Sequence, residues 1–474
     1  GKMGGGGSGS GSDSQSGPSQ PSDQTTVFPA PTPSPGINIF QPPSKPANLP
    51  EWGYFGQENE GRRVGDQFGH SIALSSDGTT MVVGAPAGGT NETGIVTVLR
   101  YTTFVPPDTP NGSILWERLG QQIRKTVAYD RAGFSVALSS DGNTVAFGAP
   151  GGISDTGSVE IHQFNDRRWS QLGRDLRGAE EGQRFGEAIS MNRDGSIVAV
   201  GSPNLVYGKV EMFQLTSSNS WELLGPELVA PMRDSGFGAA VDLNQDGTIV
   251  AIGSPRTETN GALSGMVQVY RFQSSSVGYR LLGTDVLGAS SGDLLGTSVS
   301  LSADGLTCAM GAVGSSTKQG YIQVLQLDET NNSWSIKGTQ RIMGERASDS
   351  FGQVVSISSD GTVVAVGAPS KTAARFGYVK VYAWDPDTLD WKLKGHFAPN
   401  DPVVGSRRFG YSVDLVDNSN DSNNPLPILA IGDPSHGEEK GSARVIRMLS
   451  PEEAQRTNNR NNNQLFVTED RPPP

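Results

Sequence analysis

The sequence predicts an all-β fold, a seven-bladed β-propeller with four-stranded blades. One segment recurs in seven near-copies, and a short aromatic segment that the last copy lacks stands ahead of the first copy. The chain also holds 62 Gly and 30 Pro among 474 residues, about a fifth of the total, which disfavours long helices. Both repetition and composition therefore favour a ring of short strands.

The repeat is defined by two glycines at a constant spacing. The first copy reads DQFGHSIALSSDGTTMVVGAP, and its second glycine follows the first by 15 residues in six copies and by 22 in the seventh. Steps between copies vary from 52 to 64 residues. Constant internal and variable outer spacing indicates a rigid hairpin joined by surface loops. The first glycines are Gly69, Gly133, Gly186, Gly238, Gly296, Gly352 and Gly410.

Each copy is predicted to form four strands. An alternating strand such as residues 70–74 runs into Ser-Ser-Asp-Gly, a strong hairpin signal, and a continuous apolar strand follows. The third strand alternates strictly after a glycine. The fourth has an aromatic residue four positions before a glycine, which we interpret as a wedge between blades rather than a ring of ligand-binding aromatics. These pairs are Trp116/Gly120, Trp169/Gly173, Trp221/Gly225, Tyr279/Gly283, Trp334/Gly338 and Trp391/Gly395.

Only six such pairs follow a repeat. The seventh copy ends at Met448 without one, and the missing pair, Trp52/Gly56, precedes the first repeat. We therefore expect the segment Trp52–Gly56 to complete the last blade and close the ring, leaving no orphan sheet at either end.

The ends of the chain differ in composition from the repeats. Residues 1–48 are Gly/Ser-rich and then Pro/Ser-rich, which predicts a disordered linker, and residues 450–474 predict a disordered polar tail. The propeller is expected over residues 49–449. The apolar runs are too short to span a bilayer. Because the first residue is Gly, we expect an upstream segment to supply a secretion signal or membrane tether.

Charge and residue usage exclude several classes of function. The net charge of −12 disfavours a nucleic-acid partner. One Cys excludes an internal disulfide framework, and four scattered His weaken a His-based metal site. We found no nucleophile motif or phosphate loop, so the sequence favours a protein that is not an enzyme and has no cofactor.

Phe-Gly followed 15 residues later by Gly-Ala-Pro, repeated seven times, resembles the FG-GAP repeat of integrin α-subunit propellers. It most resembles FG-GAP-like proteins of bacteria and diatom-type algae that are secreted or membrane-tethered. The resemblance covers about residues 51–449 and implies a β-propeller at the cell surface. Departures are Ala132 and Leu295 in place of Phe, Val313 in place of Pro, and Asp433 in place of Ala.

The family's calcium loops are degenerate here. In the family several turns read D-x-D/N-x-D-G-x-x-D, whose oxygens bind Ca²⁺. Most turns here keep one carboxylate, and only Asp242, Asn244 and Asp246 retain three oxygen side chains, again without the fourth ligand. We expect hairpins that hydrogen-bond their own turn, with weak calcium binding at these three residues as the alternative. For the acidic loop of the seventh copy (Asp414, Asp417, Asn418, Asp421) a solvated loop is favoured over a cation site.

Three further features have a structural interpretation. His70 lies on an inner strand and is expected to be hydrogen-bonded, and Cys308 replaces a strand valine, which predicts an inert buried thiol. Four glycosylation sequons are compatible with secretion and fall in predicted loops, at Asn91, Asn111, Asn331 and Asn420.

These observations predict a non-enzymatic recognition or adhesion module of the cell surface or extracellular space. It would bind a protein or polysaccharide through the loops of one propeller face. The longest loops, 105–113, 256–264, 314–318 and 417–427, are the candidate contacts. The alternatives are a polysaccharide hydrolase or lyase with acidic residues at the channel mouth, and a structural scaffold or wall-associated protein.

Overall fold

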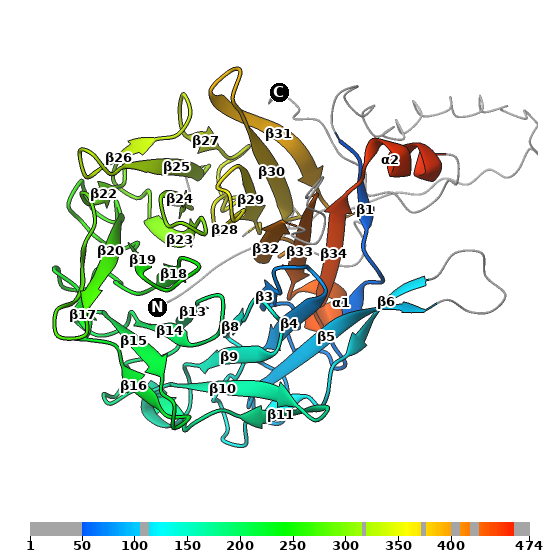
Figure 1. Ribbon diagram of the computed structural model, residues 1–474, viewed down its shortest axis with the longest axis horizontal. Coiled ribbons are helices and arrows are strands. Elements are labelled where there is room, and N and C mark those ends of the chain that lie inside the picture. Colours follow the sequence, from blue (N-terminus) through cyan, green and yellow to red (C-terminus); the bar gives the residue numbers. More distant parts are fainter. Residues whose placement is uncertain are drawn as a thin grey trace, which may run out of the picture. The chain divides into compact units, whose positions relative to one another are not determined.

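The computed structural model describes residues 50–104, 113–314, 319–370, 376–399, 408–417 and 426–458. These residues form seven sheets arranged in a ring, which confirms the seven-bladed β-propeller (Figure 1). The strands of each blade run antiparallel from the central channel outward, in chain order in every blade except the last, whose outer strand is β1.

The first four blades follow the chain from the first repeat to the fourth. Blade 1 contains β3 (Ser71–Leu74), β4 (Thr80–Ala85), β5 (Ile95–Phe104), β6 (Ser113–Arg118) and β7 (Ile123–Arg124). Blade 2 contains β8 (Ser135–Leu138), β9 (Thr144–Ala149), β10 (Ser158–Asn165), β11 (Arg168–Gln171) and β12 (Leu176–Arg177). Blade 3 contains β13 (Ala188–Met191), β14 (Ile197–Ser202), β15 (Lys209–Leu215), β16 (Trp221–Leu223) and β17 (Leu228–Val229). Blade 4 contains β18 (Ala240–Leu243), β19 (Ile249–Ser254), β20 (Met266–Ser274), β21 (Gly278–Leu281) and β22 (Val286–Leu287).

The last three blades complete the ring. Blade 5 contains β23 (Leu295–Leu301), β24 (Thr307–Ala312), β25 (Tyr321–Asp328), β26 (Ser333–Ile336) and β27 (Ile342–Met343). Blade 6 contains β28 (Val354–Ile357), β29 (Val363–Ala368), β30 (Tyr378–Asp385) and β31 (Asp390–Phe397). Blade 7 contains β32 (Ser412–Asp417), β33 (Pro427–Asp433), β34 (Ser442–Met448), β1 (Trp52–Tyr54) and β2 (Asn59–Glu60).

Six blades carry a fifth strand of two residues that the sequence did not predict. It continues the fourth strand after the motif glycine and pairs with the third strand. The glycine separates the two because it adopts a positive φ, for example 71° at Gly120, that other residues avoid. In blade 6 the equivalent Gly395 is not among the positive-φ glycines, and β31 continues through it with a register shift opposite Val381.

The ring closes as predicted. β1 pairs antiparallel with β34, aligning Trp52 with Met448 and Tyr54 with Ile446, and β2 extends the pairing to Ser442. Trp52 is 3% exposed and belongs to the hydrophobic cluster between blades 6 and 7. An N-terminal segment therefore supplies the outer strand of the C-terminal blade (Figure 1).

The two repeated glycines meet across every seam between blades. A Cβ at Gly84 would lie 2.0 Å from the carbonyl oxygen of Gly133 in the next blade. The same contact recurs around the ring and closes between Gly432 and Gly69, at 2.2 Å. The spacing of the repeat therefore has a steric cause, because no side chain fits where adjacent backbones touch.

The aromatic residues of the fourth strands fasten each blade to the preceding one. Trp169 of blade 2 donates from Nε1 to the carbonyl oxygen of Leu119 in blade 1, at 2.8 Å, and packs over Gly120. Trp116, Trp221, Trp334, Trp391 and Trp52 make the equivalent bond to the residue before the preceding blade's motif glycine. Tyr279 differs, because its hydroxyl bonds to Gly247 of its own blade. The interpretation of the motif as a wedge between blades is confirmed.

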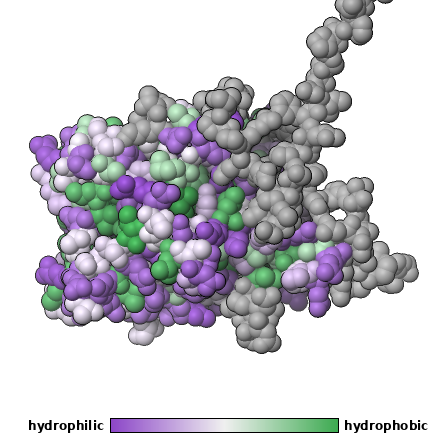
Figure 2. Space-filling model, turned by 90° about the horizontal axis from the view of Figure 1, so that it is seen from above, coloured by the Kyte–Doolittle hydropathy of each residue, from purple (hydrophilic) through white to green (hydrophobic). Residues whose placement is uncertain are grey.

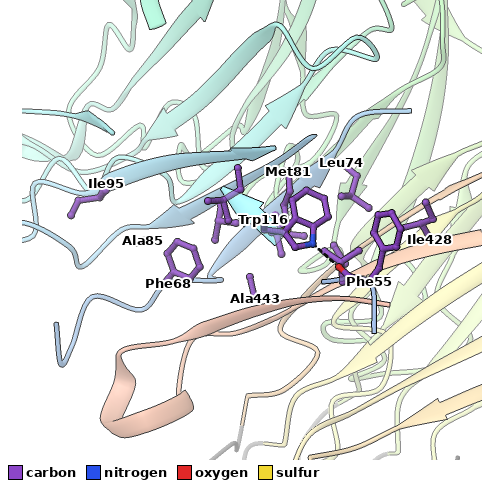
Figure 3. Close-up of a cluster of buried hydrophobic side chains, with 14 residues drawn as sticks. Phe55, Phe68, Leu74, Met81, Ala85, Ile95, Trp116, Ile428 and Ala443 are labelled. Atoms are coloured by element: carbon purple, nitrogen blue, oxygen red, sulfur yellow. Dashed lines mark hydrogen bonds between the residues drawn. The ribbon is translucent and has the colours of Figure 1, made fainter. Parts of the chain in front are cut away.

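The hydrophobic core is divided among the seams. Seven clusters of buried side chains each join two adjacent blades. Figure 3 shows the cluster between blades 7 and 1, where Trp116 packs near Phe55 and bonds to its carbonyl oxygen. On the part of the outer wall visible in Figure 2, hydrophilic side chains predominate, with hydrophobic ones interspersed.

Helices are short. A 3₁₀ turn, η1 (Ile153–Asp155), and α1 (His436–Glu439) lie in loops, and α2 (Pro451–Asn458) follows the last blade. The disordered tail predicted from residue 450 is thus helical over residues 451–458. At the start of this helix Ser450 Oγ accepts a hydrogen bond from the backbone nitrogen of Glu453, at 3.2 Å. Within the described residues no helix has the length and apolar character needed to span a membrane.

Candidate functional site

The central channel and its two mouths are the candidate functional site. The inner strands β3, β8, β13, β18, β23, β28 and β32 lie side by side around it. One mouth is surrounded by the Ser-Ser-Asp-Gly turns and their equivalents, which we call the hairpin face. The other is surrounded by the segments after each second strand and the segments that enter the next blade, which we call the loop face.

On the hairpin face the turns are satisfied by their own side chains. Ser75 donates from Oγ to Oδ1 of Asp77 at 2.6 Å, and the backbone nitrogen of Thr79 donates to the same oxygen at 2.9 Å. Burial raises the pKa of Asp77, but these hydrogen bonds outweigh it and bring the pKa below its ordinary value. The expectation of hairpins that hydrogen-bond their own turn is confirmed.

The three residues of the candidate calcium loop have separate hydrogen-bond partners. Asp246 accepts from the nitrogen and hydroxyl of Thr248, and Asn244 accepts from the nitrogen of Ile249. Asp242 accepts from Ser190 Oγ at 2.9 Å and from Leu301 N at 2.8 Å in the two neighbouring blades. Among the described residues, no three His, Cys, Asp or Glu side chains are grouped as metal ligands.

Asp242 belongs to a ring that the sequence analysis did not identify. The fourth residue after each first glycine occupies the same level of the channel, and we call this set the channel ring. Where its side chain has an oxygen, that oxygen accepts from the backbone nitrogen of the next blade's inner strand, as Asp414 does from Leu74 at 2.7 Å. The ring comprises Ala73, Ala137, Ser190, Asp242, Ser300, Ser356 and Asp414.

The five polar members of the channel ring each satisfy a backbone nitrogen that the inner edge of the next blade would otherwise leave open. Burial raises the pKa of Asp242 to about 6 and that of Asp414 to about 7, where the charge of Asp242 adds to the rise. Hydrogen bonds from Leu74 and Ser356 oppose the rise at Asp414. The two carboxyl groups are therefore mutually sensitive titrating groups inside the channel.

Two pockets open on the hairpin face. One of about 600 Å³ is lined by Ser140, Arg193 and the turn carboxylates Asp141, Asp194 and Asp246. Hydrogen bonds within the turns outweigh burial and hold the pKa of all three carboxyl groups below its ordinary value. The second, about 320 Å³, lies at the channel mouth and includes Asp417. Burial, reinforced by the charge of Asp360, raises the pKa of Asp417 to about 6.

The loop-face mouth holds an aromatic group. The ring of His70 lies between Phe134 and Tyr411, with centroid separations of 4.8 and 4.9 Å. His70 Nδ1 donates to the carbonyl oxygen of Phe134 at 3.1 Å, and burial lowers the pKa of His70 to about 4. Arg184 lies over Phe134 and Arg408 over Tyr411. His70 is thus hydrogen-bonded, as expected, and neutral at pH 7.

The loops of this face also expose apolar side chains. Among the described residues, fourteen large hydrophobic side chains are strongly exposed, and seven of them lie on this face, including Tyr129 at 56% and Tyr207 at 45%. The loops around blades 3 and 4 are joined by hydrogen bonds from Asp234 N to Val206 O and from Thr259 Oγ1 to Met232 Sδ. These seven residues, which we call the exposed apolar set, are Val64, Val127, Tyr129, Val206, Tyr207, Met232 and Leu263.

Other predicted residues are placed as follows. Cys308 is buried, and burial raises the pKa of its thiol, so the inert buried thiol is confirmed. Asn91 and Asn331 are exposed in turns, whereas Asn111 and Asn420 lie outside the described residues. Of the candidate contact loops, only 256–264 is described throughout, and it belongs to the loop face.

Comparison with known proteins establishes the fold alone. No family model matches the sequence, and no curated protein has a matching sequence. Hydrazine synthase of Kuenenia stuttgartiensis is 12% identical, with a TM-score of 0.51 over 83% of this chain and 99% of that chain. Candidate 6-phosphogluconolactonases of Bacteroides uniformis and Bacteroides fragilis are 11% and 13% identical, with TM-scores of 0.47 and 0.46. They cover 69% and 71% of this chain, and 83% and 85% of their own. The resemblance to FG-GAP repeats rests on the sequence motifs.

Proposed function

We propose that this chain is a non-enzymatic, FG-GAP-like recognition module that binds a protein partner at the cell surface or outside the cell. The loop face is the proposed contact. The observation behind this proposal is the concentration of exposed apolar side chains on that face, because such side chains gather on soluble proteins where a partner covers them.

The chemistry of the set fits a protein more closely than a polysaccharide. Its members are Tyr, Met, Val and Leu, and Tyr and Met are enriched in the buried centres of protein interfaces. Arg184 and Arg408 stand near the channel mouth and could contribute polar contacts at the rim. Hydrogen bonds between the loops of blades 3 and 4 hold part of this surface in place before binding, which lowers the entropic cost of association.

A polysaccharide hydrolase at the channel mouth is less well supported. Glycoside hydrolysis uses one carboxyl group with a raised pKa as the acid, beside a second ionised carboxylate. The carboxylates of the larger hairpin-face pocket all have lowered pKa values and cap their own turns. Asp242, Asp414 and Asp417 have raised pKa values, but each accepts a hydrogen bond from a backbone nitrogen of a neighbouring blade.

A binding screen tests the proposal. The propeller is applied to parallel arrays of extracellular protein domains and of glycans, and each saturable ligand is retested with Tyr129→Ser and Tyr207→Ser. We expect a protein ligand whose affinity falls at least about tenfold in these variants, as for central interface aromatics. Leu223→Ser and Ile336→Ser, on exposed outer strands, serve as controls. Binding to glycans alone, or equal loss in the controls, would contradict the proposal.

A further inference from the structure

One position of the third strand differs between blade 1 and the other six. In those six blades it carries a long polar side chain. These residues are Glu160, Glu211, Gln268, Gln323, Lys380 and Arg444. Blade 1 has the short Thr97 instead. Because Thr97 is shorter than its counterparts, we expect it to leave part of its seam unfilled.

Most of the long side chains are held by a partner inside the seam. Gln268 donates to Asp285 at 2.8 Å, and Arg444 forms an ion pair with Glu58 at 2.7 Å. Glu160 pairs with Lys125 at 2.9 Å, and Lys380 with Glu345 at 3.0 Å. These pairs fill their seams with matched polar groups.

In blade 1 the seam contains a hollow. Thr97 is 5% exposed and accepts one hydrogen bond, from Gln122 Nε2 at 3.1 Å. A pocket of about 410 Å³ lies beside it, between the closing segment 59–68 and β5. Its apolar lining is Phe68, Ala85, Ile95 and Leu99, and Figure 3 shows the first three of these at one end of the buried cluster.

Four arginines line the same pocket from two separate parts of the chain. Arg62 and Arg63 come from the closing segment, and Arg118 and Arg124 come from the outer strands of blade 1; all four are exposed. No ion pair with a carboxylate is recorded for any of them among the described residues, although Arg124 donates to Gln122 Oε1 at 2.7 Å.

The carboxylates of the pocket do not neutralise this charge. Glu60 faces His436, 3.6 Å away, and buried Asp66 accepts from the backbone nitrogen of Arg63 at 3.2 Å. Four cations against two carboxylates leave the pocket positively charged in a chain whose net charge is −12. The planar guanidinium group of arginine binds a carboxylate with two parallel hydrogen bonds.

We propose that this hollow, the Thr97 pocket, binds an acidic peptide segment. An aliphatic side chain of the peptide enters the space beside Thr97, and flanking carboxylates pair with the arginines. The volume of the pocket lies within the range of about 300–1,000 Å³ that ligand sites occupy. The apolar part of the lining, Phe68, Ala85, Ile95 and Leu99, suits a Leu or Ile side chain.

The proposal is independent of the loop-face partner, because the lining residues of the Thr97 pocket differ from the exposed apolar set. Its test uses three fluorescein-labelled pentapeptides at low salt: Glu-Glu-Leu-Glu-Glu, Gln-Gln-Leu-Gln-Gln and Glu-Glu-Ser-Glu-Glu. Fluorescence anisotropy reports binding to the whole chain, and a sulfated disaccharide serves as a competitor. We expect the first peptide to bind at least about tenfold more tightly than either of the others, since each lacks one of the two contacts.

Substitutions in the protein locate the site. Thr97→Gln places in blade 1 the residue that blades 4 and 5 carry there, so it should fill the hollow without unfolding the protein and weaken peptide binding at least tenfold. Arg62→Gln and Arg124→Gln should each weaken it several-fold. Arg177→Gln is the matched control, because Arg177 occupies in blade 2 the place of Arg124 and pairs with Asp175.

Two results would overturn the proposal. The first is equal peptide affinity for the wild type and for Arg62→Gln and Arg124→Gln, which substitute exposed side chains and do not depend on how Thr97→Gln packs. The second is binding of the sulfated disaccharide without saturable binding of the acidic peptide, which would show a general anion site.

Discussion

Trp52 donates a hydrogen bond from its indole nitrogen to the carbonyl oxygen of Lys394, 3.0 Å away and 342 residues later in the chain. The same bond fastens five other blades to their predecessors, but only here does it join opposite ends of the propeller. The buried indole ring of Trp52 also packs edge-to-face with the ring of Phe397, and the ring centroids lie 5.3 Å apart. The closure of the ring therefore uses the same device as every other seam.

Deleting residues 1–57 should destabilise the propeller severely, whereas deleting residues 1–45 should not. The longer deletion removes β1, leaves residues 446–448 of β34 as an unpaired edge, and exposes the cluster between blades 6 and 7. Urea unfolding followed by circular dichroism measures the difference. Equal midpoints for the two truncated proteins would refute the role of the closing strand.

Trp52→Ala should lower the free energy of unfolding by about 3–5 kcal/mol, the usual loss for a large buried aromatic. Trp52→Phe keeps much of the packing and loses the hydrogen bond to Lys394, so a smaller loss of about 1–2 kcal/mol is expected. Thermal and urea unfolding give both values. A neutral Trp52→Ala would mean that the first strand does not contribute to the folded ring.

Gly84→Ala should destabilise the protein by about 3 kcal/mol, because the new Cβ would overlap the carbonyl oxygen of Gly133 in the next blade. Gly182→Ala is the control, since its Cβ would meet nothing within 4 Å and only its φ of +72° is unfavourable. The control should lose about 1 kcal/mol. Similar losses at the two positions would argue against the steric explanation of the repeat spacing.

Asp414 should make the protein less stable as the pH rises from about 4 to about 8. Its folded pKa of about 7 lies above the ordinary 3.8, so the folded state holds this proton more tightly, and the resulting stability is lost as the pH passes through 7. One pKa unit corresponds to about 1.4 kcal/mol. Asp414→Asn should therefore gain about 1–3 kcal/mol at pH 8 relative to the wild type, and almost nothing at pH 4.

The pH series compares the two proteins by urea unfolding at each pH. Asp417 titrates in the same interval, with a pKa of about 6, and remains in both proteins, so its contribution cancels in the difference between the curves. Asp242 also remains, and the difference reports Asp414 together with its coupling to Asp242. Parallel curves would show that the Asp414 carboxyl group titrates normally.

Calcium chelation should change the melting temperature by no more than about 1–2 °C, because little metal binding is linked to folding. Asp246→Ala should cost about 1 kcal/mol with or without calcium, since Asp246 accepts two hydrogen bonds from Thr248. Differential scanning calorimetry with calcium and with chelator measures both effects. A fall of about ten degrees on chelation would establish the calcium loop.

The number of blades, the closing strand, the role of the motif tryptophans and the turns that hydrogen-bond their own side chains could be predicted from the sequence alone. These features depend on contacts that recur at fixed spacing from one copy to the next, so the repetition reveals them. Trp52 could be assigned to the last blade because its motif was the one piece that the last copy lacked.

Which unlike residues meet became visible in the folded structure alone. Asp242 and Asp414 occupy equivalent positions, but their mutual effect inside the channel depends on closure of the ring. An alignment of the seven copies shows that Thr97 is shorter than its counterparts, but it does not show the pocket. The pocket forms because the closing segment brings Arg62 beside the outer strands of blade 1. A repeat specifies contacts between corresponding residues, whereas a site arises from the residues that differ, and their positions are set by folding in three dimensions.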